Sequence, residues 1–82
     1  MSNAAALDAS LASLSAYATK CFDERRQAAR SAGYALAHHG QDSESYRAHM
    51  AAQTAWDAQL RATNEMIRAG EIAWNEMMGD AA

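Results

Sequence analysis

The stretch HHGQDS, residues 38–43, is the one convincing interruption in a chain of 82 residues that contains no proline. Gly40 follows the last residues of a helical pattern, as a glycine that ends a helix does. Asp42 or Ser43 can cap the next helix by accepting hydrogen bonds from its first backbone N–H groups. The stretch therefore predicts one helical domain over 1–82, with a helix over about 3–39, a turn at 40–42 and a second helix over about 43–78.

Apolar and small residues on both sides of this turn recur at alternating spacings of three and four, a heptad pattern that places them on one face of a helix. We call the row of side chains that faces the other helix the seam. The seam of the second helix is predicted to contain Tyr46, His49, Gln53, Trp56, Leu60, Thr63, Ile67, Gly70, Trp74 and Met77. The seam of the first helix is predicted to contain Leu7, Leu11, Leu14, Ala18, Cys21 or Phe22, Ala28 or Ala29, Ala32 and Leu36.

Folding the chain back at residue 41 brings the two seams together, with large side chains of one opposite small side chains of the other. The expected neighbours are Trp56 with Ala28 and Ala29, Leu60 with Phe22, Ile67 with Leu14 and Tyr17, and Trp74 with Leu7 and Leu11. This fit predicts an all-α fold, an antiparallel helical hairpin of two long helices. The alternative is a three-helix bundle with a break near Gly33, because a glycine inside a helix costs about 1 kcal/mol.

The hydrophobic half of the chain is mostly alanine. Valine is absent, isoleucine occurs only at positions 67 and 72, and leucine only at 7, 11, 14, 36 and 60. A small, elongated hairpin also buries less surface than a compact domain of the same mass. We therefore expect the chain to complete its core by association, with itself or with a protein partner, and we predict that the hairpin dimerises into a four-helix bundle.

The charge and the cysteine content exclude several classes of protein. A net charge of -3 gives no basic face of the kind that nucleic-acid-binding proteins carry, so we expect no nucleic-acid partner. The N-terminal residues lack the basic start of a secretory signal, and no window approaches the roughly 18 apolar residues of a membrane span, so we expect a cytoplasmic protein without a membrane partner. The single Cys21 excludes a disulfide within the chain.

Three histidines, Asp42 and Glu44 lie within residues 36–49 and raise the question of a metal site. His38 and His39 are adjacent, so on a helix their side chains point about 100° apart and cannot both bind one ion. Histidines at the end of one helix and capping residues at the start of the next are explained by the turn itself. No cysteine–histidine, serine–base or carboxylate–histidine arrangement indicates catalysis, so we expect no metal, no cofactor and no catalytic residue.

Arg25 is the one charged residue on the seam of the first helix. With Arg26 and Arg30 it could line an inter-helix pocket for a small dianion, as arginines do in chorismate-mutase-like enzymes. A small helical enzyme or ligand-binding dimer is therefore the alternative function. We expect instead that Arg25 extends along the apolar seam toward solvent or pairs with Asp57 across the hairpin.

The segment EIAWNEMMGD, residues 71–80, carries more apolar surface than the small residues opposite it can cover. Tryptophan and methionine are also enriched at protein interfaces. The predicted partner or oligomer interface consists of Trp56, Leu60, Ile67, Ile72, Trp74, Met77 and Met78.

The segment QDSESY, residues 41–46, is acidic, contains serine, ends in tyrosine and divides the chain into two helices. This layout resembles the hairpins of type III secretion needle subunits and their small co-chaperones; phage-encoded inhibitors of host factors and antitoxin-like dimers share it at this level. The needle proteins usually have a proline in this turn, which is missing here, so the resemblance assigns no residue a role. The sequence predicts a non-enzymatic protein–protein interaction module that acts as a small adaptor, chaperone or inhibitor.

Overall fold

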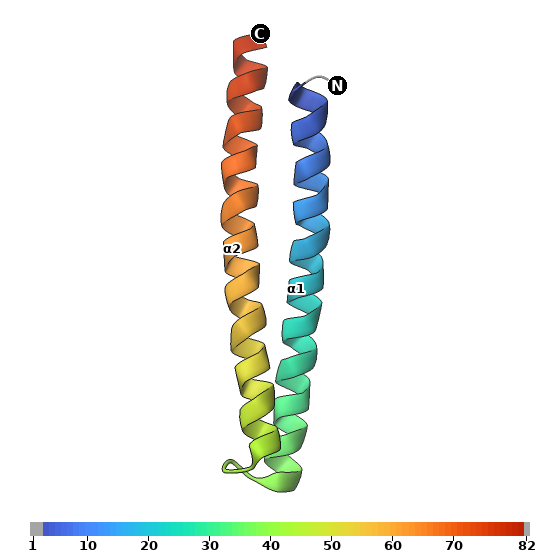
Figure 1. Cartoon of the computed structure of the whole chain (residues 1–82), viewed down its shortest axis with the longest axis vertical. Coiled ribbons are helices and arrows are strands. Elements are labelled where there is room, and N and C mark those ends of the chain that lie inside the picture. The colour runs from blue at the N-terminus through green and yellow to red at the C-terminus, as the bar shows by residue number, and fades with distance from the viewer. Residues whose placement is uncertain (1–2, 82) are drawn as a thin grey trace.

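The computed structural model describes residues 3–81, with side chains over 3–79, as two helices joined by a tight turn (Figure 1). Helix α1 spans Asn3–His39 and α2 spans Glu44–Ala81. They lie antiparallel and side by side, with both ends of the described chain at the same end of the molecule. This confirms the predicted all-α hairpin, although α2 continues beyond the predicted end near residue 78. Over the described residues, neither helix combines the length and apolarity needed to cross a membrane.

The turn is built from one glycine and one capping serine. Gly40 has a φ of 88°, in the left-handed region that favours glycine, and its N–H donates to the carbonyl of Leu36 at 3.1 Å. At the start of α2, the hydroxyl of Ser43 accepts a hydrogen bond from the N–H of Tyr46 at 3.1 Å. Ser43 is therefore the cap that the sequence left open, while the Asp42 carboxylate lies 3.9 Å from Arg47 in an exposed ion pair.

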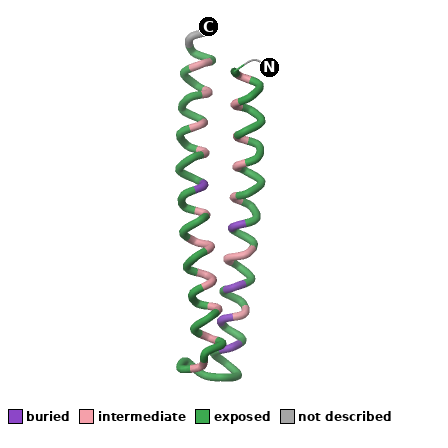
Figure 2. Tube along the Cα trace, in the orientation of Figure 1, coloured by how far each residue is buried: buried purple, intermediate pink, exposed green. Residues whose placement is uncertain are grey.

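The seam of α2 lies where the heptad pattern predicts it. All ten of its predicted residues are buried or half-buried, and Figure 2 shows that the covered positions of both helices lie on the sides turned toward each other. The seam of α1 follows the same spacing. Its covered residues are Ala4, Leu7, Leu11, Leu14, Ala18, Cys21, Arg25, Ala28, Ala32 and Ala35.

The structure decides the open positions of α1 in favour of the residue that is in phase with the heptad pattern. Cys21 is fully buried whereas Phe22 is 41% exposed, and Ala28 is buried whereas Ala29 is exposed. The prediction of Leu36 on the seam is wrong, because Leu36 is 45% exposed and Ala35 takes the position at 1%. A strict alternation of three and four from Leu7 arrives at residue 35, so helical phase outweighs the greater hydrophobicity of the neighbouring leucine.

Contacts at two positions along the helix axes fix the register of the hairpin. Arg25 bonds to Asp57, and a Cβ added to Gly70 would lie 2.6 Å from the Cδ2 atom of Leu11. Trp74 lines the same shallow hollow as Leu11, as the fold-back at residue 41 predicts. Gly70 is thus the position where α2 gives space to a large side chain of α1.

The fully covered part of the core is narrow and made of small side chains. Among residues 3–79, the buried ones are Cys21, Ala28, Ala32, Ala35 and Thr63. The hydroxyl of Thr63 donates to the carbonyl of Gln59 at 2.7 Å, so its burial leaves no polar atom unpaired. The Cα trace measures 59 × 17 × 13 Å, which is a single layer of two helices. Large seam residues remain half-buried because nothing in the described chain covers their sides.

The alternative of a break near Gly33 is wrong. Helix α1 runs without interruption through this residue, which is exposed and has nothing within 4 Å of where a Cβ would lie. A glycine costs a helix about 1 kcal/mol, and the seam contacts on both sides of Gly33 outweigh that cost.

Gly33 and Gly40 give opposite predictions for the effect of substitution by alanine on stability. We expect Gly33→Ala to raise the free energy of unfolding by about 1 kcal/mol, because alanine favours helix and the site is open. We expect Gly40→Ala to lower it by about 1 kcal/mol, because a Cβ is unfavourable at a φ of 88°. Chemical denaturation followed by circular dichroism, at one fixed protein concentration, measures both. A loss of stability in Gly33→Ala would contradict a continuous α1.

Candidate functional site

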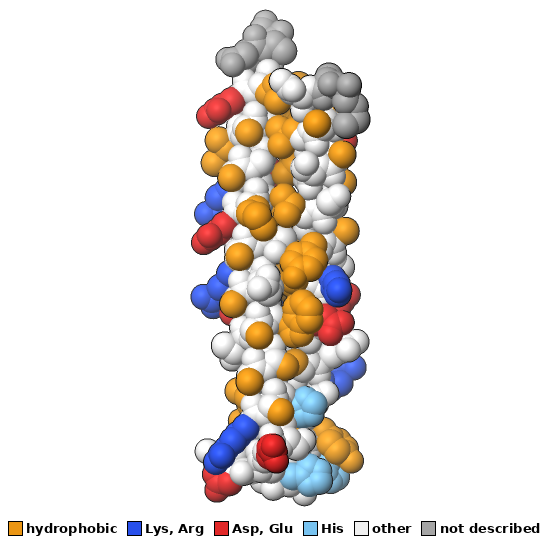
Figure 3. Space-filling view, in the orientation of Figure 1, with side chains coloured by type: hydrophobic (Ala, Val, Ile, Leu, Met, Phe, Trp, Pro, Cys, Tyr) orange, Lys and Arg blue, Asp and Glu red, His pale blue; other side chains and the backbone are white. Residues whose placement is uncertain are grey.

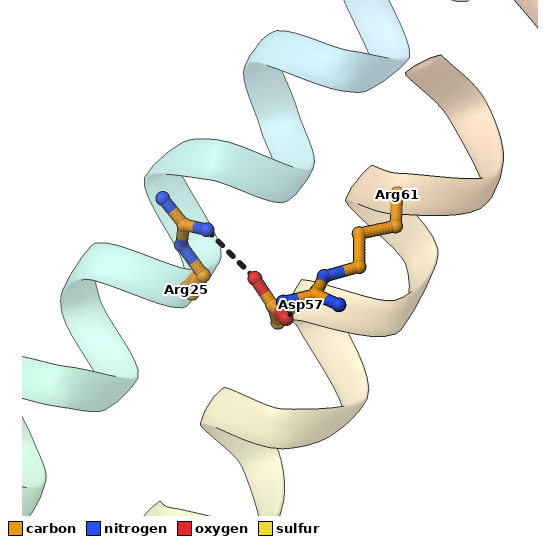
Figure 4. A network of polar contacts seen from close by, with 3 residues as sticks. All are labelled: Arg25, Asp57 and Arg61. Carbon is orange, nitrogen blue, oxygen red and sulfur yellow. Dashed lines mark hydrogen bonds and ion pairs between the residues drawn. The ribbon is translucent and has the colours of Figure 1, made fainter. Parts of the chain in front are cut away.

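An ion-pair network centred on Asp57 joins the two helices (Figure 4). The Nη1 atom of Arg25 donates to Asp57 Oδ1 at 2.7 Å, from α1 to α2. The Nε atom of Arg61 lies 3.0 Å from Asp57 Oδ2, one turn along α2. Each oxygen of the Asp57 carboxylate therefore contacts one arginine. The contact with Arg25 is the pairing that the sequence predicted.

The environment of Arg25 explains how a charge is accommodated on the seam. Its side chain is 31% exposed, and its guanidinium carbon lies 5.2 Å from the centre of the Phe22 ring. The methylene groups lie along the seam while the charged end reaches Asp57 at its edge. A slip of the hairpin by one turn would separate the two charges, so this pair favours the observed register.

The three arginines of the alternative function do not come together. Arg25 shares a shallow hollow with Met50, Gln53, Thr54 and Asp57, between the helices. Arg26 and Arg30 line a different hollow on α1 alone, with Asp23 and Gln27. Arg25, which is bonded to Asp57, therefore does not share a cavity with Arg26 and Arg30.

The histidines lie toward the turn end of the hairpin, whereas Cys21 lies near the middle of α1. His49 is half-buried on the seam of α2, while the ring of His38 stacks on Tyr34 with centres 4.1 Å apart. Within the part of the chain that the structure describes, no three histidine, cysteine, aspartate or glutamate side chains lie close enough to hold one metal ion. Cys21 is a free, buried thiol, and its hydrogen bond with Tyr17 raises the pKa of the tyrosine hydroxyl.

The predicted interface residues divide into two groups. Trp56, Leu60, Ile67, Trp74 and Met77 are half-buried on the side of α2 that faces α1. Ile72 and Met78 lie off the seam and are 53% and 39% exposed. The hairpin therefore uses the first group in its own core, and a partner could reach only the uncovered sides of these residues.

Sequence reasoning did not assign several other exposed apolar residues to the partner or oligomer interface. The remaining large hydrophobic side chains that lie at least partly open to solvent are Tyr17, Phe22, Tyr34, Leu36, Met50 and Met66. All six stand one position before or after a seam residue, which places them beside the seam on the broad faces of the hairpin. Their position next to a seam residue is the sequence feature from which their exposure could have been predicted.

Comparisons with protein-family models, with curated proteins and with solved structures returned no match.

The Asp57 network predicts a specific acid sensitivity. The hydrogen bond from Arg25 holds the pKa of Asp57 below its ordinary value; partial burial opposes this, and the charge of Arg61 adds to it. Because the folded pKa is lowered, the pair stabilises the fold fully above the unfolded pKa of about 3.9, and this contribution is lost as the pH falls through the lower folded value.

We expect Asp57→Asn to lose stability at neutral pH and to show a smaller further loss on acidification from about pH 5 to about pH 2 than the wild type. Melting temperatures followed by circular dichroism at fixed concentration measure this. Glu65→Gln, which removes an exposed carboxylate from the same helix, is the matched control. An unchanged acid profile in Asp57→Asn would show that the pair contributes nothing.

Proposed function

We propose that this chain is a non-enzymatic protein–protein interaction module, a small adaptor, chaperone or inhibitor that works through its apolar helix faces and associates with itself. The observation that carries the proposal is the exposed area. The hairpin exposes 5852 Å², whereas a compact monomer of 8.8 kDa exposes about 4,800 Å². The surplus is about 1,000 Å² for each chain.

The character of this surface supports the same proposal. The large hydrophobic residues at least 38% exposed include Met66 at 52% and Tyr34 at 64%, and they occur on both helices. Stable protein interfaces bury about 800 Å² from each partner, so the surplus exposed area of one chain is large enough to form one such interface. Methionine and tyrosine suit such surfaces, because the first adapts its shape and the second combines an apolar ring with a polar hydroxyl.

The thinness of the molecule gives a physical reason for association. With a Cα thickness of 13 Å, the half-buried seam residues are open to solvent on both broad faces. A second layer of helices would cover one of these faces and convert half-buried residues into buried ones, which is favourable by about 25 cal/mol for each Å² of apolar surface removed from water. Two hairpins packed in this way would make the predicted four-helix bundle.

Static light scattering on a size-exclusion column tests self-association. We expect a mass of at least twice the 8.8 kDa of the chain at high concentration, with dissociation toward the monomer over a hundredfold dilution. Reductant is kept present, so that a disulfide through Cys21 cannot produce the result. A mass of 8.8 kDa at every concentration, with intact helical circular dichroism, would contradict the proposal.

A further inference from the structure

The two broad faces of the hairpin differ in charge. One face carries the Arg25–Asp57 pair and, toward the chain ends, Asp8 and Glu71 in the hollow beside Trp74. The other, which we call the open face, is turned to the viewer in Figure 3. There, hydrophobic side chains gather between the helices and along α2, and the charged side chains of α2 lie toward its outer edge.

A second heptad row explains the open face on α2. It is offset from the seam and contains Ser45, Ala48, Ala52, Ala55, Gln59, Ala62, Met66, Ala69 and Ala73. These residues alternate three and four apart, and the row carries no charged side chain until its next position, Glu76, near the end of α2. Except for half-buried Ala52, each of them is exposed in the hairpin. Helix α2 thus has one seam for α1 and a second apolar row to which α1 does not pack.

We propose that a second copy of this chain packs on the open face, with α2 lying antiparallel on α2 of the second copy and α1 antiparallel on α1. This inference rests on the proposed function and names the surface and the partner through which it operates. The two-fold axis crosses α2 between Gln59 and Ala62. By the register of the hairpin, it crosses α1 near residues 20–24.

The size of the open face matches what a stable dimer requires. The hairpin measures 59 Å by 17 Å in this view, an area of about 1,000 Å². This projected area exceeds the roughly 800 Å² that each partner buries in a stable interface. One copy of the same length can cover the whole face.

The shape of the second row suits antiparallel pairing with itself. With the axis between Gln59 and Ala62, Gln59 lies opposite Ala62 of the second copy, and Met66 lies opposite Ala55 of the second copy. Each of the two larger side chains then meets an alanine, and the remaining small residues let the helices approach to about 8 Å. A parallel pairing would instead place Met66 on Met66 of the second copy and would align the helix dipoles unfavourably.

The charges on the α1 side of the open face are complementary under the same axis. Lys20 and Glu24 have opposite signs and lie one turn apart, at the height where the axis crosses α1. The two-fold operation brings Lys20 toward Glu24 of the second copy, and Glu24 toward Lys20 of the second copy. The charged residues that stand on this part of the face therefore favour a second copy of this chain over an unrelated apolar partner.

Ala62→Glu tests the proposal against Ala16→Glu. Both residues are exposed alanines in the middle of a helix, so the two variants have the same charge and closely similar helix propensity. Ala62 lies on the axis, whereas Ala16 lies on the outer side of α1. We expect the dimer dissociation constant, measured by sedimentation equilibrium, to rise at least tenfold in Ala62→Glu and to stay within about twofold in Ala16→Glu.

A charge swap provides a second readout that does not depend on Ala62. We expect Lys20→Glu and Glu24→Lys each to weaken the dimer by several fold, and the double variant to restore it, because the two-fold axis pairs these residues with each other. Circular dichroism confirms that every variant remains helical.

The outcomes separate this inference from the proposed function. A dimer as strong in Ala62→Glu as in the wild type would overturn the open face as the interface and leave self-association standing. Failure of the double charge swap to restore binding would overturn the antiparallel arrangement. A wild-type chain that stays monomeric would overturn both the inference and the proposed function.

Discussion

The contact between two rows of side chains, one on each helix, is the constraint from which the rest of this hairpin follows. Over residues 3–79, α1 supplies mainly leucine near the chain ends and alanine near the turn, and α2 supplies the complementary sizes, with Gly70 beside Leu11 and larger residues such as Trp56 toward the turn. Two helices held by one such contact bury only small side chains completely. The contact between the two rows therefore determines the register of the helices. Because it is the one contact between them, the hairpin is thin and leaves apolar surface exposed.

Polar groups determine where the chain reverses and which register the helices adopt, and they contribute less to the stability of the hairpin. The left-handed Gly40 and the Ser43 cap let the chain reverse within a few residues, which places the two seams opposite each other. The Arg25–Asp57 pair then distinguishes the observed register from one slipped by a turn. An exposed or half-exposed ion pair contributes modestly to stability, so its main effect is on the specificity of pairing.

The heptad spacing made α2 predictable, because its seam residues are mostly large or distinctive and repeat without a slip. It left α1 ambiguous, because alanine occurs on several sides of that helix and hydrophobicity alone cannot choose between Ala28 and Ala29. The prediction of Leu36 is wrong because the greater hydrophobicity of leucine favours position 36, whereas the helical phase places Ala35 on the seam. The open face escaped sequence reasoning because an alanine row has little hydrophobic contrast, and only the packed hairpin shows that α1 leaves it uncovered. The pairing of Arg25 with Asp57 was predictable, since it needed only the register and the opposite charges.

We propose that a single layer of two helices does not complete its own core, so that folding and association are linked. The thermal unfolding midpoint as a function of protein concentration tests this most directly. If association completes the core, the midpoint rises steadily with concentration, because the folded state gains free energy from binding that the unfolded state does not share. A midpoint that stays constant over a hundredfold range, with a cooperative transition at the lowest concentration, would show that the hairpin is stable alone and would contradict the account.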